Sequence, residues 1–360
     1  MSLELRNVTK KVGGETHIYE TSISFDVGGF NILLGATNAG KSTLIKLMAG
    51  LEKPSSGEVW VDGDNVTGVS PQKRNIALVH QFFVNYPHMT VFENIASPLR
   101  VQGIAKSEVE ARVEEAANIL QLGPMLKRRP QELSGGQQQR TALARAIVKK
   151  SKAIFLDEPL ANLDYKLREE LREQLPALLS GRGTVVIYAT SEPTEALLLG
   201  GRTALVYEGR ITQMGGTTEI YRTPSNLTSA RVFSDPPINL APVTKRGDRV
   251  FLGEHLSWTV FEKAAALPDG SYTVGIRPHF VTPTEPLDRS VALRGRVQIT
   301  ELSGSESIAH FAIGEQTWVS LATGIHAYRV GEEHEFHMIP GQCFYFAENG
   351  ELAAKGRDHV

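Results

Sequence analysis

The sequence of 360 residues predicts two domains, an α/β domain with a largely parallel sheet followed by a small all-β domain. Up to residue 233, short and continuously apolar runs alternate with segments of helical spacing, the pattern of strands buried between helices. Beyond residue 234, short strand-like runs are separated by turn residues, as in a small barrel. Pro236 and Pro237 interrupt helix and sheet alike. We therefore expect domains at 1–233 and 234–360.

The composition narrows the class of protein. The chain is 41% hydrophobic and 22% charged, and its net charge of −2 does not indicate the basic surface that nucleic-acid binding requires. The single cysteine excludes an internal disulfide. No stretch approaches the roughly 18 apolar residues of a membrane span, so we expect any membrane association to come through a partner.

A glycine-rich loop at 35–42 follows a predicted strand at 30–34 and opens a predicted helix from Lys41 to the stop at Gly50. Its sequence fits the pattern G-x-x-x-x-G-K-[ST], in which backbone amides surround the phosphates of a nucleoside triphosphate. Lys41 supplies a positive charge, and the Ser42 hydroxyl is a ligand for Mg²⁺. The candidate nucleotide-binding residues are Gly35, Ala36, Thr37, Asn38, Ala39, Gly40, Lys41, Ser42 and Thr43.

Two carboxylates follow the apolar run 153–156. Asp157, at the end of a strand beside the phosphate loop, can hold Mg²⁺, and Glu158 can polarise the attacking water as a general base. Paired carboxylates after a strand also occur at ordinary helix starts. Here Pro159 and the run 162–164 follow at once, which favours the catalytic interpretation.

A second anion site is predicted before a helix expected at 138–150. Glycines and a hydroxyl at a helix N-terminus present amides and a favourable dipole to phosphate. One chain's loop and another chain's helix end can then enclose one nucleotide between them. The alternative is a flexible Gly-Gly turn. The residues concerned are Leu133, Ser134, Gly135, Gly136 and Gln137.

In their order along 3–233, these motifs resemble the ATP-binding subunits of ABC transporters. The resemblance makes 35–42 the Walker A loop, 133–137 the signature, 153–158 Walker B and Leu160–Asp164 the D-loop, with a helical subdomain at about 82–150. It implies ATP and Mg²⁺ as cofactors. It also implies that Gln81 touches Mg²⁺ and the attacking water, and that Asp164 acts in the D-loop.

Further segments are similar to the carbohydrate-importer branch of this family. They are 86–95, and 275–279 with 301–306, which resemble its regulatory OB-like (TOBE) module; 7–19 looks most like one of the paired ATPases of bacterial glycerol importers. The resemblance implies an energy-coupling subunit for a small polar solute on the cytoplasmic face of the membrane. Its partners would be two transmembrane permease subunits, a second ATPase subunit and, indirectly, a solute-binding protein, without nucleic acid. The surface near Gln81 and 83–95 would face the permeases.

The chain departs from the family at three positions. Ser191 replaces the histidine that helps to fix the attacking water, Ala161 replaces a serine of the D-loop, and Val12 replaces an aromatic that stacks on adenine, with Tyr19 as a substitute. Serine is shorter than histidine and carries no charge, and loss of such a group costs on the order of 10²–10³ in rate. The catalytic set is then Glu158, Gln81 and Ser191.

Two interpretations of Ser191 stay open. One is drift that other groups compensate. The other is asymmetry, in which this subunit pairs with a different ATPase subunit and its intact signature completes the partner's competent site; a homodimer is the alternative assembly. Two other functions compete: a nucleotide-binding regulatory subunit with little hydrolysis, and a soluble ABC ATPase acting on nucleic acid or ribosomes.

Overall fold

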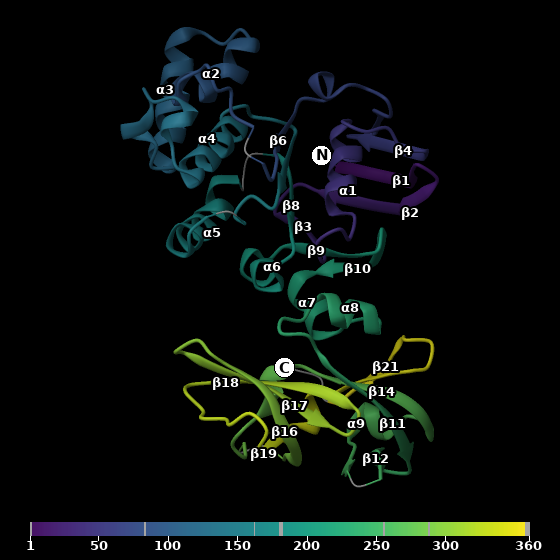
Figure 1. The fold of residues 1–360 in the computed structure, drawn as a ribbon. Helices are drawn as coiled ribbons and strands as arrows, with labels where there is room; N and C mark the ends of the chain where they lie inside the picture. Colours follow the sequence, from purple (N-terminus) through teal and green to yellow (C-terminus); the bar gives the residue numbers. More distant parts are fainter. Residues whose placement is uncertain are drawn as a thin grey trace. The chain divides into compact units, whose positions relative to one another are not determined.

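The structure is a computed structural model that divides into two compact units, Met1–Thr217 and Thr218–Val360 (Figure 1). Each unit has its own hydrophobic core. The residues that the structure describes are 2–82, 84–161, 163–179, 183–254, 256–286 and 289–356.

The central sheet of the first unit has the order β10-β9-β3-β8-β7-β6 and is parallel except for β10. Every residue of β3, β7 and β8 is buried, as their continuously apolar sequences predict. The strands are β3 (Phe30–Leu34), β6 (Ile76–Val79), β7 (Ala153–Asp157), β8 (Val185–Thr190), β9 (Arg202–Tyr207) and β10 (Arg210–Gly216).

A second, antiparallel sheet of this unit has the order β2-β1-β4-β5. Its strands are β1 (Ser2–Val12), β2 (Glu15–Asp26), β4 (Ser56–Val61) and β5 (Asp64–Asn65). Helix α1 (Lys41–Ala49) contributes Leu44, Leu47 and Met48 to a core that also contains Leu5 of β1 and Phe155 of β7. The helix that begins at the phosphate loop is therefore packed against both sheets, which holds its first turn in place.

Helices α2 (Val91–Val101), α3 (Lys106–Ile119) and α4 (Gly135–Ile147) pack on one another, as Figure 1 shows, within the range expected for the helical subdomain. Helix α4 begins three residues earlier than expected because Ser134 caps it. Helices α5 (Tyr165–Leu179) and α6 (Pro193–Leu199) flank β8 in sequence. In the described part of the chain, no helix is long and apolar enough to cross a membrane.

The second unit is built from two antiparallel sheets, of order β13-β12-β11-β14-β20-β21 and β15-β19-β16-β17-β18. Their shared core includes Trp318, Phe311 and Phe336, the last two stacked with ring centroids 4.0 Å apart. The elements are β11 (Asn239–Arg246), β12 (Arg249–Leu252), β13 (Leu256–Thr259), α9 (Glu262–Ala265), β14 (Gly270–Ile276), β15 (Val281–Thr282), β16 (Val291–Leu302), β17 (Glu306–Ile313), β18 (Gln316–Thr323), β19 (Glu333–Met338), β20 (Phe344–Phe346) and β21 (Leu352–Lys355).

The two units divide between Thr217 and Thr218, ahead of the boundary expected at residue 234. The reason lies in the short helices α7 (Thr217–Arg222) and α8 (Leu227–Val232). Ala230 of α8 shares a small buried cluster with Ile238 and Phe344 of the second unit. Turn-like 3₁₀ segments complete the two units at Pro71–Arg74, Gly123–Met125, Pro130–Glu132, Pro278–Phe280 and Pro340–Gln342.

Candidate nucleotide-binding and catalytic site

Residues 35–40 form the loop that connects β3 to α1. The amide of Gly35 donates to the carbonyl of Thr190 at 3.3 Å, and the amide of Gly209 donates to the carbonyl of Ala39 at 2.8 Å. A Cβ at Gly35 would lie 2.2 Å from a backbone oxygen of β9, and Gly40 has φ 112°, so neither position accepts a side chain. The loop is therefore held from both sides in a conformation that requires its glycines.

Lys41 is a buried cation with three oxygen partners. Its side chain is 4% exposed, and its Nζ donates to the carbonyls of Gly35 at 2.8 Å and Ala36 at 3.0 Å. It also lies 3.2 Å from Oε1 of Glu158. A buried ammonium that holds both the loop and a carboxylate is positioned to exchange one of these oxygens for a phosphate oxygen.

Ser42 and Asp157 lie together, as expected of residues that share a metal ion. The Ser42 hydroxyl donates to Oδ1 of Asp157 at 3.0 Å. Burial raises the pKa of Asp157, and the hydrogen bond from Ser42 partly offsets this effect. A hydroxyl beside a buried carboxylate fits Mg²⁺, which takes oxygen ligands and would favour the ionised carboxylate.

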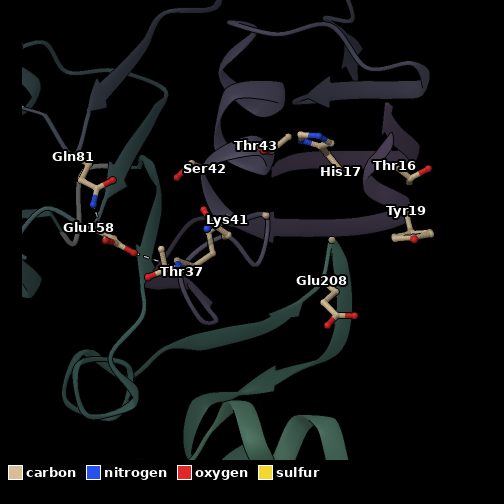
Figure 2. A pocket seen from close by; sticks show the side chains of 13 residues that line it. Thr16, His17, Tyr19, Thr37, Lys41, Ser42, Thr43, Gln81, Glu158 and Glu208 are labelled. Atoms are coloured by element: carbon tan, nitrogen blue, oxygen red, sulfur yellow. Dashed lines mark hydrogen bonds and ion pairs between the residues drawn. The ribbon is translucent and has the colours of Figure 1, made fainter. Parts of the chain in front are cut away.

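Gln81 and Glu158 also meet. Nε2 of Gln81 donates to Oε2 of Glu158 at 3.1 Å, so Gln81 and Lys41 hold the two oxygens of one carboxylate (Figure 2). Glu158 has φ 48°, a left-handed conformation that non-glycine residues seldom adopt and that concentrates at functional sites. Gln81 and Lys41 thus hold the Glu158 carboxylate, directly after β7, beside the phosphate loop.

The structure brings nine of the predicted residues to one cavity of about 520 Å³ (Figure 2). It is lined by Thr16, His17, Tyr19, Thr37, Asn38, Gly40, Lys41, Ser42, Thr43, Gln81, Glu158, Glu208 and Gly209. Tyr19 borders this cavity, whereas Val12 does not. The guanidinium of Arg210 lies 3.5 Å from the centre of the Tyr19 ring.

Ser191 is not among the lining residues. It is exposed in the turn between β8 and α6, directly after Thr190, whose carbonyl accepts the amide of Gly35. Ser191 therefore lies beside the start of the loop with a side chain too short to extend into the cavity from there. A catalytic role of Ser191 stays a prediction.

The residues predicted as the signature lie at the start of α4 and do not line this cavity. Ser134 and Gln137 make a reciprocal capping box, with the Gln137 amide 3.4 Å from the Ser134 hydroxyl. The next amides, at the first turn of the helix, have no acceptor within it. A Cβ at Gly135 would meet nothing within 4 Å, so the packing of this chain does not require glycine there. Leu133 is buried and anchors the segment.

The D-loop lies between β7 and α5. Leu160 and Leu163 are buried, Asn162 lies outside the described residues, and the Asp164 carbonyl accepts the amide of Arg168 in the first turn of α5. The Asp164 carboxylate acts electrostatically on Arg140 of the signature helix α4. Asp164 does not line the nucleotide cavity.

Sequence reasoning missed four lining residues. They are Thr16 and His17 on β2, and Glu208 and Gly209 in the turn between β9 and β10. The glycine after Glu208, between two strand-like runs, signalled a hairpin. No signal in the sequence connected that hairpin with the phosphate loop.

The fold and the site together define a P-loop ATPase domain joined to a β-rich second unit. The protein-family model described as ABC transporter matches residues 19–161. Among solved structures, the dimeric ATP-binding cassette MJ0796 bound to ADP and Pi aligns with a TM-score of 0.55 and 28% identity, covering 60% of this chain and 98% of that one.

Two curated relatives extend the similarity beyond the cassette. The sn-glycerol-3-phosphate import ATP-binding protein UgpC of Pectobacterium atrosepticum is 36% identical over 354 residues, covering 97% of this chain and 98% of that protein. UgpC 3 of Rhizobium etli is 38% identical over 313 residues, covering 87% of each. The chain belongs to the ATP-binding subunits of ABC transporters, in the carbohydrate-importer branch. Such subunits couple ATP hydrolysis to transport by transmembrane permease subunits.

Proposed function

We propose that this chain is the energy-coupling subunit of an importer for a small polar solute of the glycerol, polyol or sugar class. The observation that carries this proposal is the convergence of Lys41, Ser42, Gln81 and Glu158 on one cavity. The relatives named for sn-glycerol-3-phosphate import support the solute class. Nothing in the chain's balanced charge favours action on nucleic acid.

In this proposal the Walker A residues 35–43 hold the triphosphate, and the base extends toward the end of the cavity that Tyr19 borders. Lys41 exchanges Glu158 for a phosphate oxygen, which releases that carboxylate to accept a proton from water while Gln81 keeps it oriented. Ser42 and Asp157 would hold Mg²⁺ together with Gln81, and the ion would neutralise charge that develops on the phosphates.

The signature would serve a second ATPase subunit. Ser134 and Gly135 are exposed, and the open space at Gly135 leaves room for the approach of a partner's nucleotide to Leu133–Gln137. Asp164 would act at the same junction. We infer an assembly of two ATPase subunits on two permease subunits at the cytoplasmic face of the membrane, fed by a solute-binding protein.

The segment after Gln81 is the surface that would meet the permeases. Phe82 is 73% exposed and Val84 is 60% exposed, while Phe83 lies outside the described residues. Arg145 of α4 donates to the carbonyl of Val84 and lies over the Tyr86 ring. The exposed segment is thus tied to Glu158 through Gln81 at one end and to the signature helix at the other.

The position of Ser191 favours a heteromeric pair in which the Walker site of this chain is slow and its signature serves the partner. It also favours a second candidate function, a nucleotide-binding regulatory subunit with little hydrolysis. ATP binding should survive in both cases because Lys41 and Gln81 are in place.

ATP turnover by the purified chain and by the assembled transporter tests these proposals. We expect slow turnover of the chain alone, a large gain with Ser191→His, and loss of that gain when Glu158→Gln is added. Robust turnover by a homodimer of the wild-type chain would contradict the asymmetry. Co-purification with nucleic acid instead of membrane subunits would contradict the importer.

A further inference from the structure

The nucleotide cavity has an end that the phosphate loop does not form. Its walls there come from β2 and from the turn between β9 and β10, and they carry Thr16, His17, Tyr19 and Glu208. Because the loop and Lys41 take the triphosphate, the ribose and base must extend toward this end. The inference below rests on the proposed binding of ATP in this cavity.

Two aromatic rings line this end of the cavity, and they differ in whether the ring face already has a contact. Tyr19 already has the guanidinium of Arg210 at 3.5 Å from its ring centre. His17 is exposed, and among the described residues the structure gives its ring neither a hydrogen bond nor a ring partner. Figure 2 shows His17 extending from β2 toward the first turn of α1, where Thr43 lines the same cavity. Of the two, only His17 has a ring without a partner.

The backbone that carries His17 is fixed against the phosphate loop. Ile18 is fully buried, and its Cδ1 atom lies 2.9 Å from the position a Cβ would take at Gly40. On the other side, the amide of Tyr19 donates to the carbonyl of Gly209 at 3.0 Å. The backbone from which the imidazole extends is therefore fixed relative to the phosphate loop, which limits the positions that the ring can take.

Position 12 cannot provide this platform. Val12 lies at the end of the β1–β2 hairpin, paired with Glu15, is 48% exposed and does not line the cavity. We propose that the imidazole of His17 is the surface on which the nucleobase stacks in this chain, and that it sets the affinity for the base. Stacking uses the π-face and needs no hydrogen bond from the ring.

Calorimetric titration of the full chain with Mg-ATP and with Mg-tripolyphosphate, which lacks a base, tests this role. His17→Ala should weaken ATP binding about 5- to 100-fold, the range of one base–aromatic stack, and leave tripolyphosphate binding unchanged. His17→Phe should restore ATP affinity, which a purely structural role of histidine would not predict. Val12→Ala is the matched control on the same hairpin and should bind both ligands as the wild type does.

Several outcomes would overturn the proposal. ATP affinity unchanged in both His17→Ala and His17→Gln would exclude stacking on this ring, and selective loss of ATP in Tyr19→Ala alone would assign the base to Tyr19. An equal loss of both ligands in His17→Ala would place its effect on the phosphates or on the fold. A wild-type chain that binds neither ligand would reject the nucleotide site itself, a result distinct from a selective change at His17.

Discussion

At the scale of single residues, the site depends on charged groups that are buried with partners. Lys41 is surrounded by carbonyl and carboxylate oxygens, and Asp157 is 3% exposed with the Ser42 hydroxyl as its donor. Such burial opposes ionisation of a carboxyl unless a cation is close. The arrangement is therefore built for a ligand that brings positive charge to Asp157 and negative charge to Lys41.

Substitution of Asp157 separates the effect of its burial on stability from its predicted role in binding Mg²⁺. Burial raises the pKa of Asp157 above its ordinary value of 3.8, so the carboxyl favours the folded state while protonated, and that contribution is lost as pH rises through the folded pKa. We expect Asp157→Asn to melt at a higher temperature than the wild type near pH 7, and the difference should shrink as the pH falls toward the ordinary pKa of 3.8. Mg²⁺-dependent strengthening of ATP binding should disappear. A variant that is less stable than the wild type at pH 7 would contradict the burial effect.

At the scale of elements, the turn from β8 to α6 is held by a buried cluster. Oε2 of Glu195 accepts the Thr190 hydroxyl at 2.6 Å and the Tyr188 hydroxyl at 3.1 Å. Arg172 of α5 lies 3.8 Å from Glu195. The cluster fixes the residues directly before Ser191, so the position of that serine follows from the packing of β8, α5 and α6.

Truncating Glu195 tests this support. Glu195→Ala leaves two buried hydroxyls without their acceptor and should cost about 2–4 kcal/mol. Glu195→Gln keeps an acceptor and removes a carboxylate whose pKa burial has raised, so it should cost less than about 1 kcal/mol. Hydrogen exchange of the β8 amides measures both values. If both variants lost the same free energy of unfolding, the hydrogen-bond acceptor at position 195 would not be the source of the stabilisation.

At the scale of the whole molecule, the chain consists of two units with separate cores. Sequential motifs for nucleotide chemistry lie in the first unit, and the second is a pair of packed sheets. The only cysteine of the sequence, Cys343, lies in the core of the second unit. The reactivity of this thiol therefore reports on the opening of the second unit alone.

Thiol labelling makes this separation measurable. Cys343 is 1% exposed, and burial raises the pKa of its thiol to about 12. At pH 8 the native chain should react with N-ethylmaleimide on the order of 10³-fold more slowly than a free thiol, because so little thiolate is present. The same cysteine should react fully in denaturant. Rapid stoichiometric labelling of the native chain would show that the core of the second unit opens readily.

The amino-acid sequence by itself determined the motifs whose parts are contiguous. The loop 35–42 and the carboxylates at Asp157 and Glu158 depend on neighbouring backbone, so spacing and residue type were sufficient to predict the strand before each of them and the helix after the loop. The helix after Leu133 was also predicted, but its capped start at Ser134 was not. The apolar runs also identified the buried strands β3, β7 and β8.

The tertiary structure alone decided what meets across long distances in the chain. Gly209 and His17 join the phosphate loop in one cavity, Val12 and Ser191 do not, and α8 belongs to the second unit. These outcomes depend on which strands pair and which apolar faces bury one another, as when β9 aligns beside β3. Local spacing does not encode such partners. The hydrophobic effect is not directional, so it stabilises contact between any complementary apolar surfaces that the completed fold brings close.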